Sequence, residues 1–164
     1  MKEMDGPTLG IIAGLIGVSV LMLRVTKKKV AIAATPECTL EQIPEVFSRL
    51  KQEGTNGSFA VFMFQPPDSS KTDDAINIQF SIEQGKIGVD WCLIGPINIR
   101  DKDKLEQFLS THKYKYQLRE MNGMKYVRVE EGNLPGLCQK VIKDLYAQRP
   151  DVKLDMVVEG FSWP

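Results

Sequence analysis

Two alternating runs between residues 76 and 93 constrain the fold most strongly. In each run every second side chain is apolar, and the turn sequence EQGK separates them. A period of two residues places alternate side chains on opposite faces of a β-strand. The segment therefore predicts an antiparallel hairpin with one face in a core and with Asp90 on the opposite, solvent-facing side. The apolar positions are Ile76, Ile78, Phe80, Ile82, Ile87, Val89, Trp91 and Leu93.

Helices and further strands are expected around this hairpin. Apolar residues at helical spacing predict helices over residues 39–53, 101–113 and 133–149, the first opened by the capping-box pattern of Thr39 to Gln42 and the last capped by Asn133. Pro44 favours a later start for the first helix. Strands are expected over residues 58–65, 114–121, 124–131 and 152–158, the middle two joined by the type I′ turn that Asn122-Gly123 favours. The order α-β-β-β-α-β-β-α-β predicts an α+β fold, an antiparallel sheet with helices on one face.

An apolar segment near the N-terminus is interrupted only by Arg24 between residues 7 and 25. As a helix of about 1.5 Å per residue it would reach roughly 28 Å, close to the hydrocarbon thickness of a bilayer. A signal peptide carries its positive charge before the apolar run, whereas here the charge follows it. We therefore expect this chain to begin with a single transmembrane helix that is kept. The residues that define the anchor are Leu9, Gly10, Gly14, Gly17, Leu23, Arg24, Lys27, Lys28 and Lys29.

The basic cluster also predicts orientation and domain organisation. Lysine and arginine flank the cytoplasmic ends of membrane helices, so we expect a single-pass membrane protein with its C-terminal domain in the cytoplasm. Gly10 and Gly14 form a GxxxG pattern, and Ala13 and Gly17 a second pair of small residues, which would let two helices approach closely and form a homodimer. The expected organisation is an anchor over residues 1–29, a linker over 30–37 and one α+β domain over 38–164.

Composition argues against several classes of function. The chain carries 21 basic and 21 acidic side chains, so the tyrosines and lysines of residues 114–126 favour a solvated strand over a nucleic-acid partner. Its three cysteines contain no CxxC pair, which argues against a disulfide framework or a metal site. Glycine-rich phosphate loops, nucleophile elbows and paired His and Cys are absent from the sequence. We therefore expect no catalytic residue, no cofactor and no enzymatic activity.

The strand pair AINIQFSIEQGKIGVDWCLIG, together with the order of elements, resembles the type III secretion chaperones and the related YbjN-like and TY-Chap proteins. The resemblance covers about residues 38–148 and is one of pattern. It implies a domain that dimerises and holds an extended client segment along apolar grooves and sheet edges. Two features depart from that family: this chain is neutral where secretion chaperones tend to be acidic, and it carries the predicted membrane anchor.

These observations lead to one expected function and one alternative. We expect a membrane-tethered, non-catalytic domain that binds a protein partner or client at the cytoplasmic face. The alternative is an immunity or antitoxin-type protein that sequesters a folded effector. Because aromatic side chains are enriched at binding hot spots, the expected partner surface comprises Tyr114, Tyr116, Leu118, Phe161 and Trp163. For Phe161 and Trp163 the alternative is packing against the core.

Overall fold

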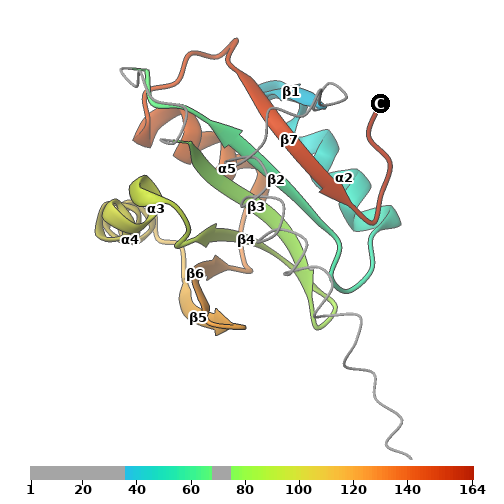
Figure 1. The fold of residues 1–164 in the computed structure, drawn as a ribbon, viewed down its shortest axis with the longest axis horizontal. Coiled ribbons are helices and arrows are strands. Elements are labelled where there is room, and N and C mark those ends of the chain that lie inside the picture. The colour runs from blue at the N-terminus through green and yellow to red at the C-terminus, as the bar shows by residue number, and fades with distance from the viewer. Residues whose placement is uncertain (1–35, 68–74) are drawn as a thin grey trace, which may run out of the picture.

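A seven-stranded antiparallel sheet forms the centre of the part of the protein that the computed structural model describes, residues 36–67 and 75–164 (Figure 1). The strands lie in the order β1-β7-β2-β3-β4-β6-β5, and every neighbouring pair is antiparallel. Four α-helices complete an α+β fold, as the sequence predicts. The strands are β1 (Glu37–Thr39), β2 (Phe59–Phe64), β3 (Ile76–Glu83), β4 (Lys86–Cys92), β5 (Gln117–Met121), β6 (Met124–Val129) and β7 (Lys153–Glu159).

The helices follow the predicted segments with three differences. A 3₁₀ turn, η1 (Leu40–Gln42), precedes α2 (Ile43–Glu53), so Pro44 lies in the first turn, where its missing N–H costs little. A short helix, α3 (Pro96–Arg100), which the sequence did not predict, leads into α4 (Lys102–Thr111). The last helix, α5 (Leu134–Lys140), continues as one π-helical turn, η2 (Val141–Leu145), rather than as α-helix to residue 149. Asn133 caps α5 as predicted, because its Oδ1 accepts a hydrogen bond from Gly136 N at 3.0 Å.

One face of the sheet and the helices share a single hydrophobic core. Ile76, Ile78 and Phe80 of β3 belong to it, together with buried side chains from all four helices. The ring of Phe80 packs edge-on against those of Phe47 and Phe62, with centroids 5.2 and 5.5 Å away. The predicted strand and its core face are therefore confirmed. The prediction that β3 is half-buried is wrong, because Asn77, Gln79 and Ser81 on its other face are buried as well. The three cysteines are free and buried, as expected of small apolar side chains.

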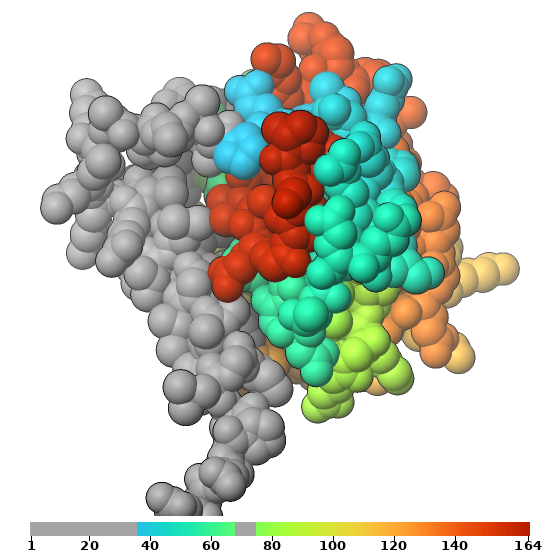
Figure 2. All heavy atoms as spheres, turned by 90° about the vertical axis from the view of Figure 1, so that its right-hand side faces the viewer, coloured from blue at the N-terminus to red at the C-terminus, as the bar shows by residue number. Residues whose placement is uncertain are grey.

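The predicted transmembrane helix, its GxxxG pattern and the lysine cluster lie outside the described residues. Within residues 36–67 and 75–164, no helix is both long and apolar enough to cross a bilayer. The C-terminal residues lie against α2, as the dark red atoms beside the teal ones show in Figure 2.

Candidate functional site

Strand β5 has a hydrogen-bonded neighbour on one side only. It pairs with β6 from Gln117 opposite Arg128 to Met121 opposite Met124, and within the described ranges no strand pairs with its outer edge. The opposite end of the sheet is the shorter β1, three residues long. A free strand edge presents N–H and C=O groups that can pair with another chain. The outer edge of β5 is therefore the longer of the two edges available for pairing.

The turn after β5 determines which backbone groups point outward. Asn122 and Gly123 have φ angles of 53° and 79°, which confirms the predicted type I′ turn. The residues that flank such a two-residue turn, Met121 and Met124, form a hydrogen-bonded pair, and bonded and non-bonded pairs alternate along an antiparallel ladder. The N–H and C=O groups of Leu118 and Glu120 therefore point away from β6, toward the open edge.

The structure places the predicted partner-surface residues at two separate ends of the sheet. Tyr114, Tyr116 and Leu118 lie together at β5; Leu118 is 53% exposed, whereas both tyrosines are half-buried against the core. Phe161 and Trp163 follow β7, which four strands separate from β5. Both are half-buried, and the guanidinium of Arg49 in α2 lies 5.5 Å from the centroid of the Trp163 ring. The five residues therefore do not form one continuous surface.

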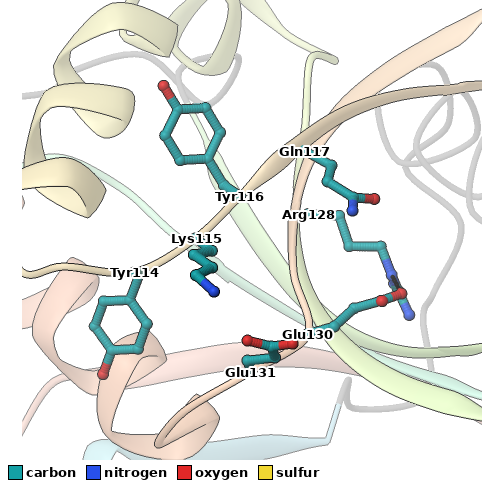
Figure 3. A pocket seen from close by; sticks show the side chains of 7 residues that line it. All are labelled: Tyr114, Lys115, Tyr116, Gln117, Arg128, Glu130 and Glu131. Atoms are coloured by element: carbon teal, nitrogen blue, oxygen red, sulfur yellow. Dashed lines mark hydrogen bonds and ion pairs between the residues drawn. The ribbon is translucent and has the colours of Figure 1, made fainter.

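A cavity of about 440 Å³ lies where the pairing of β5 with β6 ends (Figure 3). Beyond Gln117 and Arg128 the two chain segments are no longer paired. Figure 3 shows Lys115 pointing toward Glu130 and Glu131, while Tyr116 points the opposite way, toward a helix. The cavity is therefore lined by side chains of positive and of negative charge, next to the open edge of β5. Its lining comprises Tyr114, Lys115, Tyr116, Gln117, Arg128, Glu130 and Glu131.

The sheet face opposite the helices contains a buried ion pair. Asp90 was predicted to face solvent, and that prediction is wrong, because its side chain is 0% exposed. Arg128 lies directly opposite Asp90 in β6, and its Nη1 donates to Asp90 Oδ1 at 2.6 Å. Ser81 Oγ and Gln79 Nε2 donate to Asp90 Oδ2 at 2.5 and 3.1 Å. The carboxylate is therefore fully paired away from water, as a buried charge must be.

The guanidinium of Arg128 is equally buried and is bonded on all sides. Its Nε donates to Glu130 Oε1 at 2.7 Å, its Nη2 donates to the carbonyl oxygen of Lys86 at 3.0 Å, and its Nη1 also donates to Ser81 Oγ at 2.8 Å. Gly88 makes room for it, since a Cβ at that position would lie 2.6 Å from Arg128 Cζ. The absence of a side chain at residue 88 is therefore a requirement of the network.

Arg119 extends the same network to the edge strand. Its Nη1 lies 3.2 Å from Glu83 Oε2 and 2.9 Å from Glu130 Oε1, and its Nε and Nη2 donate to Gln117 Oε1 at 3.0 and 2.8 Å. Tyr126 also donates to Glu83, at 3.1 Å. The network therefore joins β5 to β3 and β6 through side chains as well as through the backbone ladder.

The two glutamates of the network differ in acidity. Burial, together with the nearby charge of Asp90, raises the pKa of Glu83, and these effects outweigh Arg128 and the hydrogen bonds from Tyr126 and Arg119. Burial would raise the pKa of Glu130 as well, but its hydrogen bond from Arg128 and the other contacts with both arginines hold that pKa below its usual value. Of the two glutamates, Glu130 is therefore the one whose negative charge is favoured.

Cysteine and histidine side chains take no part in the hydrogen bonds and ion pairs of this network. The thiols of Cys92 and Cys138 are buried, which raises their pKa values well above the usual range. His112 is exposed at the end of α4 and contacts Phe108. Over the two described ranges, no group of three or more His, Cys, Asp or Glu side chains is placed to hold a metal ion.

Comparison of the chain with models of known protein families, with curated proteins and with solved structures finds no match. The resemblance to secretion chaperones therefore rests on the pattern of the strand pair and the order of elements. The network residues were missed at the sequence level, although a signal for them exists. Asp90 and Arg128 each stand between two apolar residues of a strand, and pairing those strands in register places the opposite charges face to face.

Proposed function

We propose that this protein is a membrane-tethered, non-catalytic binding domain that holds an extended segment of a partner protein as an added strand on β5. The observation that carries the proposal is the open edge of β5, whose second residue, Leu118, has a large apolar side chain that is 53% exposed. In strand addition, main-chain hydrogen bonds supply affinity and alternate side chains supply specificity. The tether is the apolar segment of residues 7–25, and the lysines after it orient the domain toward the cytoplasm.

The edge of β5 contains neither a proline nor a bulge, two features that commonly protect a free edge against pairing. Proteins blunt free edges with bulges, prolines or charged side chains that an incoming strand would have to desolvate. Here Arg119, the basic residue of β5, is neutralised by Glu83 and Glu130, and β5 contains no proline. An incoming strand would therefore meet unpaired backbone, the exposed side chain of Leu118 and one charge without an ion pair among the described residues, the carboxylate of Glu120.

The ionic network also fixes the position of the edge before binding. Because Arg119 is bonded to Glu83 of β3 and to Glu130 after β6, the edge strand is held by groups from two other segments. A binding site that is already ordered loses less conformational entropy when its partner arrives. The network thus supports binding without contacting the partner.

Site-specific photocrosslinking in the membrane tests this proposal. A benzophenone amino acid replaces Leu118 in the full-length protein, and Gln52, an exposed residue of α2, serves as the matched control position. We expect crosslinks from position 118 to a segment of the partner that has no secondary structure of its own, and none from position 52. A partner captured equally at both positions, through a folded surface, would contradict strand addition and favour the immunity-type alternative.

A further inference from the structure

We infer that the partner segment runs antiparallel to β5 and carries, from its N-terminus, a basic residue followed at every second position by two apolar residues. This inference rests on the proposed function and specifies the chemistry of its ligand. It follows from the side chains that β5 presents on the face toward the helices. On that face lie Glu120, Leu118 and, just before the strand, Tyr116.

The apolar part of the pattern follows from Leu118 and Tyr116. Leu118 pairs on its inner side with the buried Val127 of β6, while its outer side is exposed. Tyr116 is half-buried against the core and shares the same face two residues earlier. Apolar side chains directly opposite both positions would cover this surface, since cross-strand apolar pairs stabilise a ladder.

The basic part of the pattern follows from Glu120. Its side chain is exposed, and among residues 36–67 and 75–164 it makes no ion pair, although Lys125 lies opposite it in β6. A lysine or arginine on the outer side of Glu120 would form a cross-strand pair of opposite charge. On the other face of β5, Gln117 and Arg119 are already bonded to each other, so small polar residues suit the alternate positions of the partner.

The direction of the partner follows from the sheet. Every pair in the described sheet is antiparallel, and antiparallel pairing is slightly more stable per residue than parallel pairing. Because Leu118 and Glu120 direct their backbone groups outward, the residues opposite them exchange hydrogen bonds with β5. Read from its N-terminus, the segment therefore presents its basic residue to Glu120, then an apolar residue to Leu118, then another to Tyr116.

Fluorescence anisotropy with labelled synthetic peptides tests the pattern on the full-length protein in nanodiscs. The first probe is the peptide Thr-Lys-Thr-Val-Thr-Leu-Thr, and the second carries Glu in place of Lys. We expect the lysine peptide to bind about fivefold more tightly, and the preference to reverse in Glu120→Lys. Glu159→Lys, at an exposed position of β7, makes the same change in net charge and should leave the preference unaltered.

Leu118→Pro separates failure of the pattern from failure of strand addition. Proline at this position removes an outward N–H without removing a bond to β6, whereas Leu118→Ala keeps that N–H. Both peptides binding equally, with binding lost in Leu118→Pro, would overturn the inference and leave the proposed function standing. Binding by neither peptide, or binding that Leu118→Pro leaves intact, would overturn both.

Two further measurements complete the test. A lysine peptide methylated on the backbone nitrogens that face Leu118 and Glu120 should lose binding to the wild-type protein, so the result does not depend on the folding of the proline variant. If instead the wild-type protein is a dimer that Leu118→Pro dissociates, a second copy of the chain occupies the edge, and the inference is overturned.

Discussion

Gly88→Ala tests whether the buried ionic network stabilises the fold. Alanine is normally preferred to glycine within a strand, because glycine loses more conformational freedom on folding, and the exchange is expected to stabilise by about 0.5–1 kcal/mol. The φ angle of Gly88 is not in the positive range, so a side chain there causes no backbone strain. The new Cβ would, however, lie 2.6 Å from Arg128 Cζ and 2.9 Å from Arg128 Nε.

The guanidinium of Arg128 must therefore move, and its pairing with Asp90 breaks. Both side chains are 0% exposed, so the displaced charges remain out of water. Breaking a buried ion pair costs about 3–5 kcal/mol. After subtraction of the backbone gain, Gly88→Ala should lower the free energy of unfolding by about 2–4.5 kcal/mol. A lower free energy of unfolding would thus show the effect of the network, whereas a higher one would show only the preference of strands for alanine over glycine.

Urea unfolding of the full-length protein, followed by tryptophan fluorescence, measures this change. The control places Gly88→Ala in a background with Asp90→Leu and Arg128→Met, where the charged groups are replaced by apolar ones. There the alanine should be neutral or stabilising. A Gly88→Ala protein at least as stable as wild type would refute the conclusion that residue 88 must remain without a side chain.

Three further predictions concern other contacts. The pKa values of Glu130 and Asp101 lie below their ordinary values of 4.5 and 3.8. The stability that these carboxylates provide is therefore present above the ordinary values and is lost as the pH falls through the lowered pKa values. Thermal unfolding between pH 6 and 3 should show this loss, and the Glu130→Gln protein should lose less stability over the same range. Asn98 is fully buried and bonds three backbone groups, so Asn98→Ala should destabilise by about 3 kcal/mol in urea unfolding, and an unchanged midpoint would contradict this role. Trp163→Ala removes the ring over which the Arg49 guanidinium lies. We expect thermal unfolding to show a loss of stability of about 1 kcal/mol, with no effect on capture of the partner at β5. Loss of capture would place the tryptophan in the partner surface.

Periodicity predicted most of the elements because it depends on local burial. The alternation of Ile76, Ile78 and Phe80 identified the strand and its core face, although not the burial of its other face, and Asn122-Gly123 identified the type I′ turn. The short strand β1 and helix α3 were missed, because segments of three and five residues are too short to show a period. The periodicity of apolar residues thus predicted the elements that are long enough to show it.

The candidate site was less accessible from the sequence. Alternation places Asp90 on the face opposite Trp91 but does not show whether that face is buried. Asp90 was therefore wrongly predicted to be exposed to solvent. The burial of Asp90 depends on Arg128, which lies 38 residues away along the chain and meets it only through the register of β4 with β6. Leu118, which was predicted to lie in a partner surface, is exposed, but its place on an open edge follows from the strand order, which local pattern does not determine.

Residue-resolved hydrogen exchange of β5, with and without bound partner peptide, tests the central proposal most directly. In the free protein the amides of Leu118 and Glu120 point outward and should exchange quickly, while those of Gln117, Arg119 and Met121 are bonded to β6 and should exchange slowly. Strand addition predicts that the peptide slows exchange at Leu118 and Glu120 specifically. Unchanged exchange at these two amides, with protection appearing elsewhere on the domain, would contradict binding at the open edge of β5.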